Sequence, residues 1–337
     1  MELISVVMPV FNAASHVSKA IESILSQTYK NIEFIIIDDG SVDESLEIIE
    51  FYAALDNRIR VVSNGKMGLV AALNYGIHIS KGLWIARMDA DDICMENRLE
   101  RQIQFVLQNK LDMCGSWAKK FGSSVDSIVL PCSHDEIVID LLFKSSFVHP
   151  SVIFKKVVFD ILNYSNSFKH AEDYHLWTQM VAKGMRLGNI PEYLLRYREH
   201  GEQVSTLHRA EQNNVSNIVR SQYLNLFLQS NGMNSSEFSS LIKNFHSLES
   251  LDDLGCEMFL TVFQKLQGIK KIYFASCVSR LYVELGLLTK RSLLYYLKFS
   301  FLTRTIAAHQ FFYMLAMVML PKNFRKKFKI FCKKLFY

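Results

Sequence analysis

Segments rich in apolar residues alternate with amphipathic segments along the first 110 residues of the chain. Apolar residues dominate positions 4–10, 32–37, 58–62 and 83–88, which predicts four largely buried β-strands. Apolar positions at helical spacing predict helices near residues 17–25, 43–55, 68–79 and 98–109. Ser41 and Glu44 have capping-box spacing for the second helix. The alternation predicts an α/β fold with an open, mostly parallel sheet flanked by helices.

Polar side chains follow three of the predicted strands. Asn12 follows the first strand, Asp38 and Asp39 close the second, and an acidic cluster at 89–92 follows the fourth. Ligands of doubly wound sheets bind beyond the carboxyl ends of the strands. A nucleotide fits such a site, because Asp38 or Asp39 can accept a hydrogen bond from a base N–H or a ribose hydroxyl.

The acidic cluster consists of Asp89, Asp91 and Asp92, three carboxylates within four residues. Close like charges are unfavourable unless a cation compensates them, and oxygen ligands favour Mg²⁺ or Mn²⁺. Such an ion would bind a diphosphate. The alternative is a solvated acidic turn, which we disfavour because the cluster directly follows an apolar strand.

Composition and missing motifs narrow the class of protein. Neither Gly-x-Gly-x-x-Gly nor Gly-x-x-x-x-Gly-Lys-Ser/Thr occurs in the sequence, which argues against a dinucleotide-dependent dehydrogenase and a P-loop ATPase. The 6 cysteines lack paired spacing, so they indicate neither a zinc site nor a disulfide framework. The first residues carry neither a basic segment nor a hydrophobic signal core, so we expect a cytoplasmic location.

Seven motifs in order over residues 4–205 resemble those of glycosyltransferase family 2. They are SVVMPVFN at 5–12, IDDGSVD at 37–43, GLVAALN at 68–74, ARMDADD at 86–92, VHPSV at 148–152, AEDYHLW at 171–177 and YREHGEQVS at 197–205. Each motif alone is weak, but chance does not produce all seven in order. The resemblance implies a GT-A (Rossmann-like) domain over residues 1–210. It also implies transfer of a hexose from a nucleotide-diphospho-sugar donor, with inversion at the anomeric carbon.

The resemblance also assigns donor-binding functions to particular residues. It implies that Asp39 contacts uracil and that Pro9 and Asn12 line the nucleoside pocket. Arg196 and Arg198 are expected to bind phosphate oxygens, since guanidinium groups suit them. The nucleotide would therefore be UDP, although the residues alone leave Asp38 and Asp39 as alternatives.

For the metal, the resemblance makes Asp91 the principal carboxylate, supported by Asp89 and Asp92. Which of the three coordinates directly and which acts through water stays open. His200 is expected to complete the metal shell, with the alternative that it is a hydrogen-bonded structural residue. Arg87 is expected to pair with the acidic cluster beside the donor. The ion would stabilise negative charge on the departing diphosphate.

Inverting transfer needs a general base for the acceptor hydroxyl, and we assign this function to Asp173. In the family the Glu-Asp pair opens a helix near the donor sugar, and here Glu172 precedes Asp173. Two adjacent carboxylates beside Trp177 can raise one pKa toward neutrality. For Glu172 the alternative to a function as base is that it orients the acceptor. The competing interpretation is a pair of helix N-terminal acids stabilised by the macrodipole.

The region 211–337 is predicted to be mainly helical and to end in a basic tail. Residues 265–337 carry a net charge of +14, whereas the remainder carries −9. The apolar segment 306–320 is shorter than the ~20 residues that a membrane-spanning helix needs. Residues 322–337 alternate Lys or Arg with Phe, Ile and Leu, as in a basic amphipathic helix. We therefore expect peripheral binding to an anionic membrane surface, the inner face of the cell membrane, rather than to nucleic acid.

A membrane-bound transferase favours a saccharide or lipid-linked acceptor in cell-envelope polysaccharide or lipooligosaccharide synthesis. No Trp follows an Arg, unlike in processive relatives, so we expect one hexose per encounter. A nucleotidyltransferase that makes a nucleotide sugar is the first alternative. It normally needs a Gly-rich basic loop, where this chain has FNAASH at 11–16. A catalytically inactive sugar-binding protein is the second, but it need not retain Asp91 and Asp173.

Overall fold

The computed structural model describes residues 2–63, 65–201 and 208–233, and part of 262–278. The chain forms two compact units. Unit 1 comprises residues 1–137 and 144–219, and unit 2 comprises residues 138–143 and 220–337. The domain boundary that we propose from the sequence, between residues 210 and 211, falls in the first turn of helix α8 (Arg209–Ser230).

Unit 1 is built on one mixed sheet in the order β3-β2-β1-β4-β8-β6-β9-β5, with β7 paired to β6. The first four strands in this order are parallel, and β8 then runs antiparallel to β4 and β6. The described strands are β1 (Ile4–Val10), β2 (Ile32–Asp38), β3 (Ile59–Ser63), β4 (Trp84–Arg87), β5 (Ile93–Cys94), β6 (Met113–Gly122), β7 (Ser127–Ile128), β8 (Ile153–Lys155) and β9 (Leu187–Glu199). The predicted α/β fold with a mostly parallel sheet is confirmed, and its antiparallel pairings lie beyond β4.

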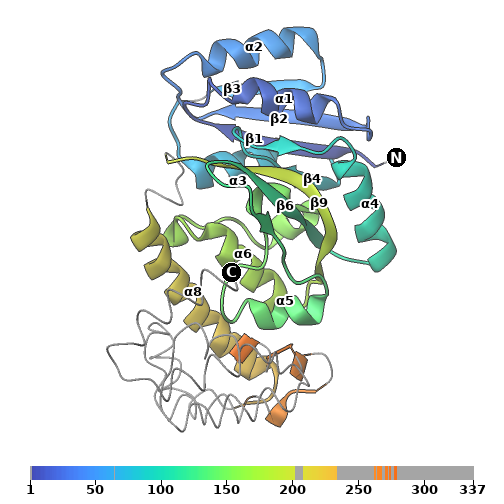
Figure 1. Ribbon diagram of the computed structural model, residues 1–337, viewed down its shortest axis with the longest axis vertical. Coiled ribbons are helices and arrows are strands. Elements are labelled where there is room, and N and C mark those ends of the chain that lie inside the picture. The colour runs from blue at the N-terminus through green and yellow to red at the C-terminus, as the bar shows by residue number, and fades with distance from the viewer. Residues whose placement is uncertain are drawn as a thin grey trace. The chain divides into compact units, whose positions relative to one another are not determined.

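Helices flank this sheet, as Figure 1 shows. Val6, Met8 and Ile36 face one side and cluster with residues of α1. Val7 and Ile37 face the other side, where α3 approaches so closely that a Cβ on Gly76 would lie 2.6 Å from both side chains. The described helices are α1 (Val17–Leu25), α2 (Ser45–Leu55), α3 (Leu69–Ile79), α4 (Arg98–Asn109), α5 (His134–Asp140), α6 (Glu172–Ala182) and α8. Burial of both sheet faces explains why β1 and β2 are apolar almost throughout.

The capping box predicted for α2 is wrong. The helix begins at Ser45, and Glu44 makes no side-chain capping hydrogen bond. Instead, the Ser41 hydroxyl accepts a hydrogen bond from the Asn12 backbone N–H at 3.0 Å. The Asp43 carboxylate accepts from the backbone N–H groups of Ala14 and Ser45, both at 3.0 Å. Ser41 therefore joins the loops that follow β1 and β2, while Asp43 bonds both to the loop after β1 and to the first residue of α2.

In unit 2, the hydroxyl of Tyr223 on α8 donates to the backbone carbonyl of Val138 at 2.9 Å. Within the described parts of the chain, no helix has the length and apolar character to cross a membrane. The segments 306–320 and 322–337, to which we assigned an apolar stretch and a basic tail, lie outside the described residues.

Candidate active site

The carboxyl ends of β1, β2 and β4 lie at one edge of the sheet, because the three strands are parallel neighbours. The loop after β1 is held rigidly there. Asn12 has a left-handed backbone (φ 51°), and its side-chain oxygen accepts from the Val42 backbone N–H at 2.9 Å. Asn12 is exposed and Pro9 is half-buried. Both residues that we expected to line a nucleoside pocket therefore lie at this edge.

Asp38 and Asp39 have different environments. Asp38 is buried, and its oxygens accept from the Ser41 backbone N–H and the Ser63 hydroxyl, both at 3.2 Å. Asp39 accepts from the backbone N–H groups of Met67 and Gly68 at 2.6 and 2.9 Å. Asp38 thus closes its own turn, while Asp39 joins β2 to the segment that begins α3.

Phe11 and Lys66 form an exposed pair beside this loop. Phe11 belongs to the first motif, but neither residue was assigned a function from the sequence. The Phe11 side chain is 44% exposed, and the Lys66 ammonium lies 4.3 Å from its ring centroid. An exposed aromatic face and a cation next to Asn12 suit a nucleobase and a phosphate. The aromatic residue directly after β1 was the available signal, whereas Lys66 is brought to it only by the fold.

The acidic cluster is compact and partly buried. Ligand oxygens of Asp89, Asp91 and Asp92 lie within 4.8 Å of one another. Asp92 is 1% exposed, and its Oδ2 has no hydrogen-bond partner among the described residues. Burial, and then the charges of Asp89 and Asp91, raise the pKa of Asp92 well above its usual value. A buried carboxylate oxygen without a donor, in a set of oxygen ligands, fits a hard divalent cation.

Arg87, at the end of β4, pairs with this cluster. Its Nη1 lies 2.5 Å from Asp89 Oδ2, and the arginine is 4% exposed. Burial raises the pKa of Asp89, Arg87 opposes that increase, and Asp91 adds to it. Beneath it, the fully buried Arg98 of α4 donates from Nη2 to the Arg87 carbonyl at 2.9 Å. The sequence predicts Arg98 only as a helix residue, and its hydrogen bond to the end of β4 was not predicted.

The end of β9 returns to the cluster from about a hundred residues away. Arg198 donates from its backbone N–H to Asp92 Oδ1 and from Nε to the Asp91 carbonyl, both at 2.7 Å. His200 Nε2 lies 3.0 Å from Asp91 Oδ2, and the His16 ring centroid is 5.7 Å from that of His200. The structure therefore brings Arg198 and His200 to the acidic cluster, and it adds His16, which the motifs did not mark. Arg196 is exposed, with its guanidinium 4.7 Å from the Phe121 ring.

Glu172 and Asp173 form the first turn of α6. Burial, and then the charge of Glu172, raise the pKa of Asp173 to about 7, and Arg87 opposes the increase. The Glu172 side chain is buried, and its Oε2 has no hydrogen-bond partner among the described residues. Glu172 also contributes to the raised pKa of Asp89, so the two acidic groups share one electrostatic environment. A carboxyl group with a pKa near neutrality suits a general base.

His149 and Tyr164 complete the buried side of this environment. His149 Nε2 and the Tyr164 hydroxyl lie 2.8 Å apart. Burial, and then the charge of Arg87, hold the pKa of His149 well below its usual value, so the ring stays neutral. His149 is thus a hydrogen-bonded neutral residue beside Arg87. The sequence motifs missed Tyr164, which lies outside all of them.

Comparisons with known proteins agree with this fold. The family model "Glycosyl transferase family 2" matches residues 5–149. The O-antigen biosynthesis glycosyltransferase WbnJ of Escherichia coli is 36% identical over 209 residues, covering 60% of this chain and 82% of the relative. The UDP-Glc:alpha-D-GlcNAc-diphosphoundecaprenol beta-1,3-glucosyltransferase WfaP of Escherichia coli is 31% identical over 227 residues, covering 66% and 87%.

A solved structure, S. aureus TarS 1-349 in complex with UDP-GlcNAc, superposes with a TM-score of 0.55 at 14% identity, covering 94% of this chain and 91% of that one. The mixed sheet with an acidic cluster at its carboxyl edge is a GT-A glycosyltransferase fold. The chain belongs to glycosyltransferase family 2 and is an enzyme of the glycosyltransferase class.

Proposed function

We propose that this enzyme transfers one hexose from a UDP-sugar, with inversion, to a saccharide or lipid-linked acceptor in cell-envelope polysaccharide or lipooligosaccharide synthesis. The observation that carries the proposal is the convergence of three acidic residues, Arg198 and His200 at the edge where the Asn12 and Asp39 loops lie. The names of the two E. coli relatives, one for O-antigen biosynthesis and one for a diphosphoundecaprenol-linked acceptor, support this class of product.

The donor nucleotide is bound between the loops after β1 and β2. Asp39 accepts the uracil N3–H with the lone pairs left free by the amides of residues 67 and 68. The Phe11 ring lies beside the base, and Lys66 and Arg198 neutralise phosphate oxygens. The TarS complex with UDP-GlcNAc and the UDP-Glc in the name of WfaP support a uridine donor.

A divalent cation, Mn²⁺ or Mg²⁺, would be held by Asp91, Asp89, Asp92 and His200. When bound, it supplies Lewis-acid stabilisation of the charge that develops on the leaving diphosphate. The protein's own residues prepare this site. Arg87 limits the repulsion among the carboxylates by pairing with Asp89, and Arg198 fixes Asp92 through its backbone N–H.

Asp173 removes the proton from the acceptor hydroxyl. A pKa of about 7 allows a substantial fraction of ionised carboxylate at neutral pH while keeping it a useful base. Asp173 is half-buried and so stays accessible to the acceptor hydroxyl, and the buried Glu172 orients the acceptor beside it. Both carboxylates also lie in the first turn of a helix, where the macrodipole stabilises negative charge.

The choice of donor nucleotide is testable by thermal unfolding. A ligand that binds only the folded protein raises its melting temperature. We expect UDP with Mn²⁺ to raise it more than dTDP, GDP or CTP with Mn²⁺, and more than UDP without metal. Preferential stabilisation by another diphosphate would overturn the uridine assignment. Stabilisation by CTP alone would favour the nucleotidyltransferase, and no stabilisation by any nucleotide would favour the inactive binding protein.

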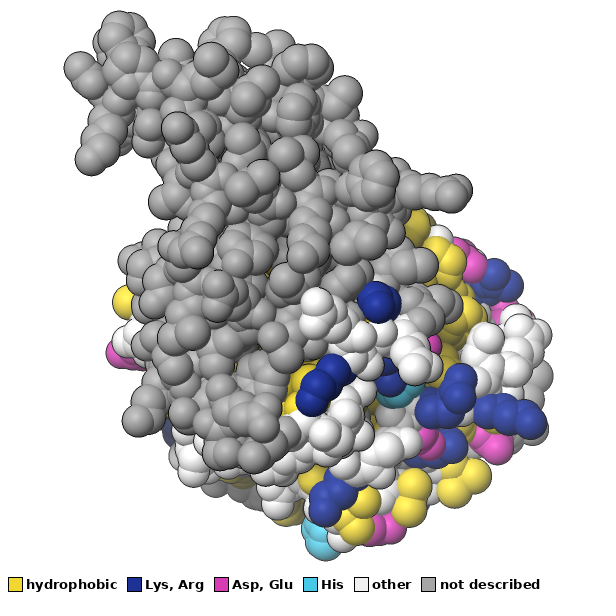
Figure 2. Space-filling view, turned by 90° about the horizontal axis from the view of Figure 1, so that it is seen from below, with side chains coloured by type: hydrophobic (Ala, Val, Ile, Leu, Met, Phe, Trp, Pro, Cys, Tyr) yellow, Lys and Arg dark blue, Asp and Glu magenta, His cyan; other side chains and the backbone are white. Residues whose placement is uncertain are grey.

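We also propose that residues 322–337 hold the enzyme on an anionic membrane surface at the inner face of the cell membrane. The segment carries seven Lys or Arg residues and no acid. Each basic residue near such a surface contributes about 1 kcal/mol. Basic, acidic and hydrophobic side chains are interspersed on the described part of the face in Figure 2. The proposal rests on the basic and apolar residues of the tail sequence.

Deleting residues 322–337 is expected to release the protein from vesicles that contain phosphatidylserine. Cosedimentation of full-length and shortened protein measures the effect. Neutral phosphatidylcholine vesicles and 0.5 M salt serve as controls. Salt weakens an electrostatic surface interaction, because the Debye length falls from ~10 Å at 0.1 M to ~3 Å at 1 M. Equal sedimentation of both proteins with the anionic vesicles would show that the tail is not the anchor.

A further inference from the structure

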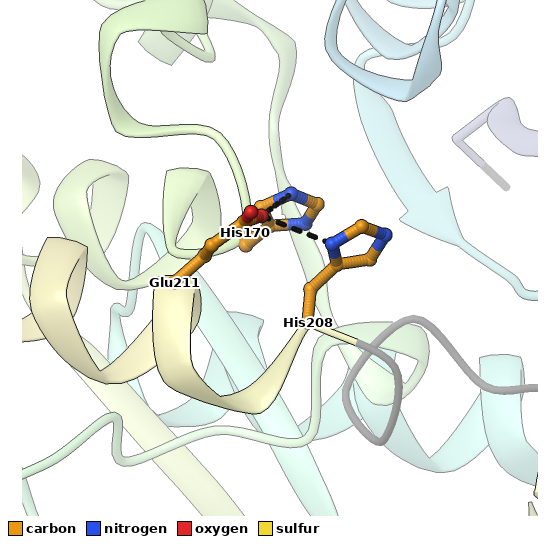
Figure 3. Close-up of side chains that lie close together, drawn as sticks. All are labelled: His170, His208 and Glu211. Atoms are coloured by element: carbon orange, nitrogen blue, oxygen red, sulfur yellow. Dashed lines mark hydrogen bonds and ion pairs between the residues drawn. The ribbon is translucent and has the colours of Figure 1, made fainter.

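Two histidines and a glutamate, none of them part of the acidic cluster, form a second group of possible metal ligands. Figure 3 shows their side chains. Glu211 Oε2 lies 3.0 Å from His208 Nδ1 and 3.3 Å from His170 Nε2. The two imidazole rings are nearly parallel, with centroids 4.4 Å apart and an interplanar angle of 14°. All three residues belong to unit 1, and their ligand atoms lie within 4.8 Å of one another.

The backbone holds the three side chains from two segments far apart in the sequence. His208 and Glu211 are three residues apart at the start of α8, so they share one face of the first turn. His170 lies just before α6 in a left-handed conformation, with φ 73°. The side-chain amide of Gln212, the residue after Glu211, donates to the His170 carbonyl at 2.9 Å. This bond fixes the backbone of His170 against α8.

Two of the three ligand-atom distances are close to those of a tetrahedral transition-metal site, and one of the nearly parallel rings, the half-exposed His208, must turn to direct its nitrogen at the same ion. Zinc bonds of ~2.1 Å to nitrogen and oxygen place neighbouring ligand atoms about 3.4 Å apart. The two observed N···O distances, 3.0 and 3.3 Å, are close to that edge. The His170 side chain is 10% exposed, whereas His208 and Glu211 are 44% and 65% exposed, so solvent can reach a fourth position.

We propose that His170, His208 and Glu211 bind one divalent transition-metal ion of the zinc class, with water as the fourth ligand. Imidazole nitrogen favours Zn²⁺ over Mg²⁺, so this site differs in chemistry from the oxygen-rich acidic cluster. The cysteine spacing gave no indication of zinc, because the ligands here are histidine and glutamate from distant segments.

The consequence of metal binding is a cross-link between the start of α8 and the segment before α6. His170 lies two residues before Glu172, so the ion would restrain the backbone that leads into the Glu172–Asp173 pair. We expect stoichiometric Zn²⁺ to raise the melting temperature of the full chain, because the ion binds only when both segments are in place.

The test is competition between the metal-free full-length protein and a zinc-binding dye. We expect one tight equivalent of Zn²⁺ in the wild type, weakened at least ~100-fold in His208→Gln and in Glu211→Gln. The substituted side chains are substantially exposed, so both variants are expected to fold, which circular dichroism checks. His78→Gln and Glu47→Gln, at exposed positions on α3 and α2, are the matched controls and keep wild-type affinity.

Asp91→Asn separates this site from the acidic cluster. We expect it to retain the tight zinc equivalent and the zinc-dependent rise in melting temperature. With Co²⁺, the wild type is expected to show the strong visible absorption of a tetrahedral site, and His208→Gln to lose it. Equal zinc affinity in the wild type and His208→Gln overturns the proposal, as does loss of the tight equivalent in Asp91→Asn alone. Neither result depends on whether the enzyme uses a UDP-sugar.

Discussion

Replacing Asp91 with asparagine is expected to abolish metal-dependent donor binding and to lower the transfer rate by at least about 10²-fold. The substitution removes one negative charge from a cluster whose ligand oxygens lie within 4.8 Å, so the attraction for a divalent cation falls. It also removes the charged partner of His200 at 3.0 Å. Calorimetric titration with UDP, with and without Mn²⁺, measures binding, and release of UDP from the sugar nucleotide measures transfer.

The metal-free variant provides an internal check on this reasoning. The charge of Asp91 contributes to the raised pKa values of Asp89 and Asp92, so its removal relieves a repulsion that opposes folding at neutral pH. The partly exposed pair with His200 is worth only about 0–1 kcal/mol. Metal-free Asp91→Asn should thus unfold at a temperature no lower than wild type. Asp126→Asn, at an exposed position, is the control. Wild-type Mn²⁺-dependent binding in Asp91→Asn would exclude Asp91 as the principal metal carboxylate.

Much of the first half of the fold could be predicted from apolar periodicity, since buried strands and amphipathic helices leave strong patterns. The helix predicted at 98–109 has the observed bounds, Arg98–Asn109. The start of α2 was misjudged because Ser41 bonds to the neighbouring loop, and Asp43 is the residue that accepts from the backbone N–H of Ser45 at the start of the helix. The antiparallel insertion of β8 between β4 and β6 leaves no comparable local signal, because strand order depends on long-range pairing.

The candidate site likewise contains residues that the sequence marks and residues that only the fold brings together. Asp89, Asp91 and Asp92 are contiguous, so charge repulsion marked them in the sequence. Other groups of the site are brought in only by the fold, such as the His16 ring, which lies beside His200. The same holds for the Lys66 ammonium over Phe11 and for His170 near Glu211. Only tertiary structure brings these groups together, and motif spacing contains no record of it.

Replacing Asp173 with asparagine is expected to lower kcat by about 10²–10⁴-fold while leaving the Kd for UDP unchanged. The amide keeps the shape of the side chain but cannot take a proton from the acceptor hydroxyl. For the wild type, kcat/KM should fall tenfold per pH unit below about 7, because the base must be ionised. The pH profile and calorimetric binding of UDP distinguish loss of chemistry from loss of the donor.

The competing interpretation, a helix N-terminal acid, predicts a different outcome. Glu47 occupies the first turn of α2 and is exposed, so Glu47→Gln removes a comparable interaction with a helix dipole, worth about 0.3–1 kcal/mol. We expect that control to retain full transfer. The pKa of Asp173 is raised in the folded state, so its ionisation opposes folding as pH rises from about 4 to 7. Asp173→Asn should therefore be as stable as wild type, or more stable, at pH 8. An inactive variant that is also strongly destabilised there would contradict the base assignment, and so would full transfer by a folded one.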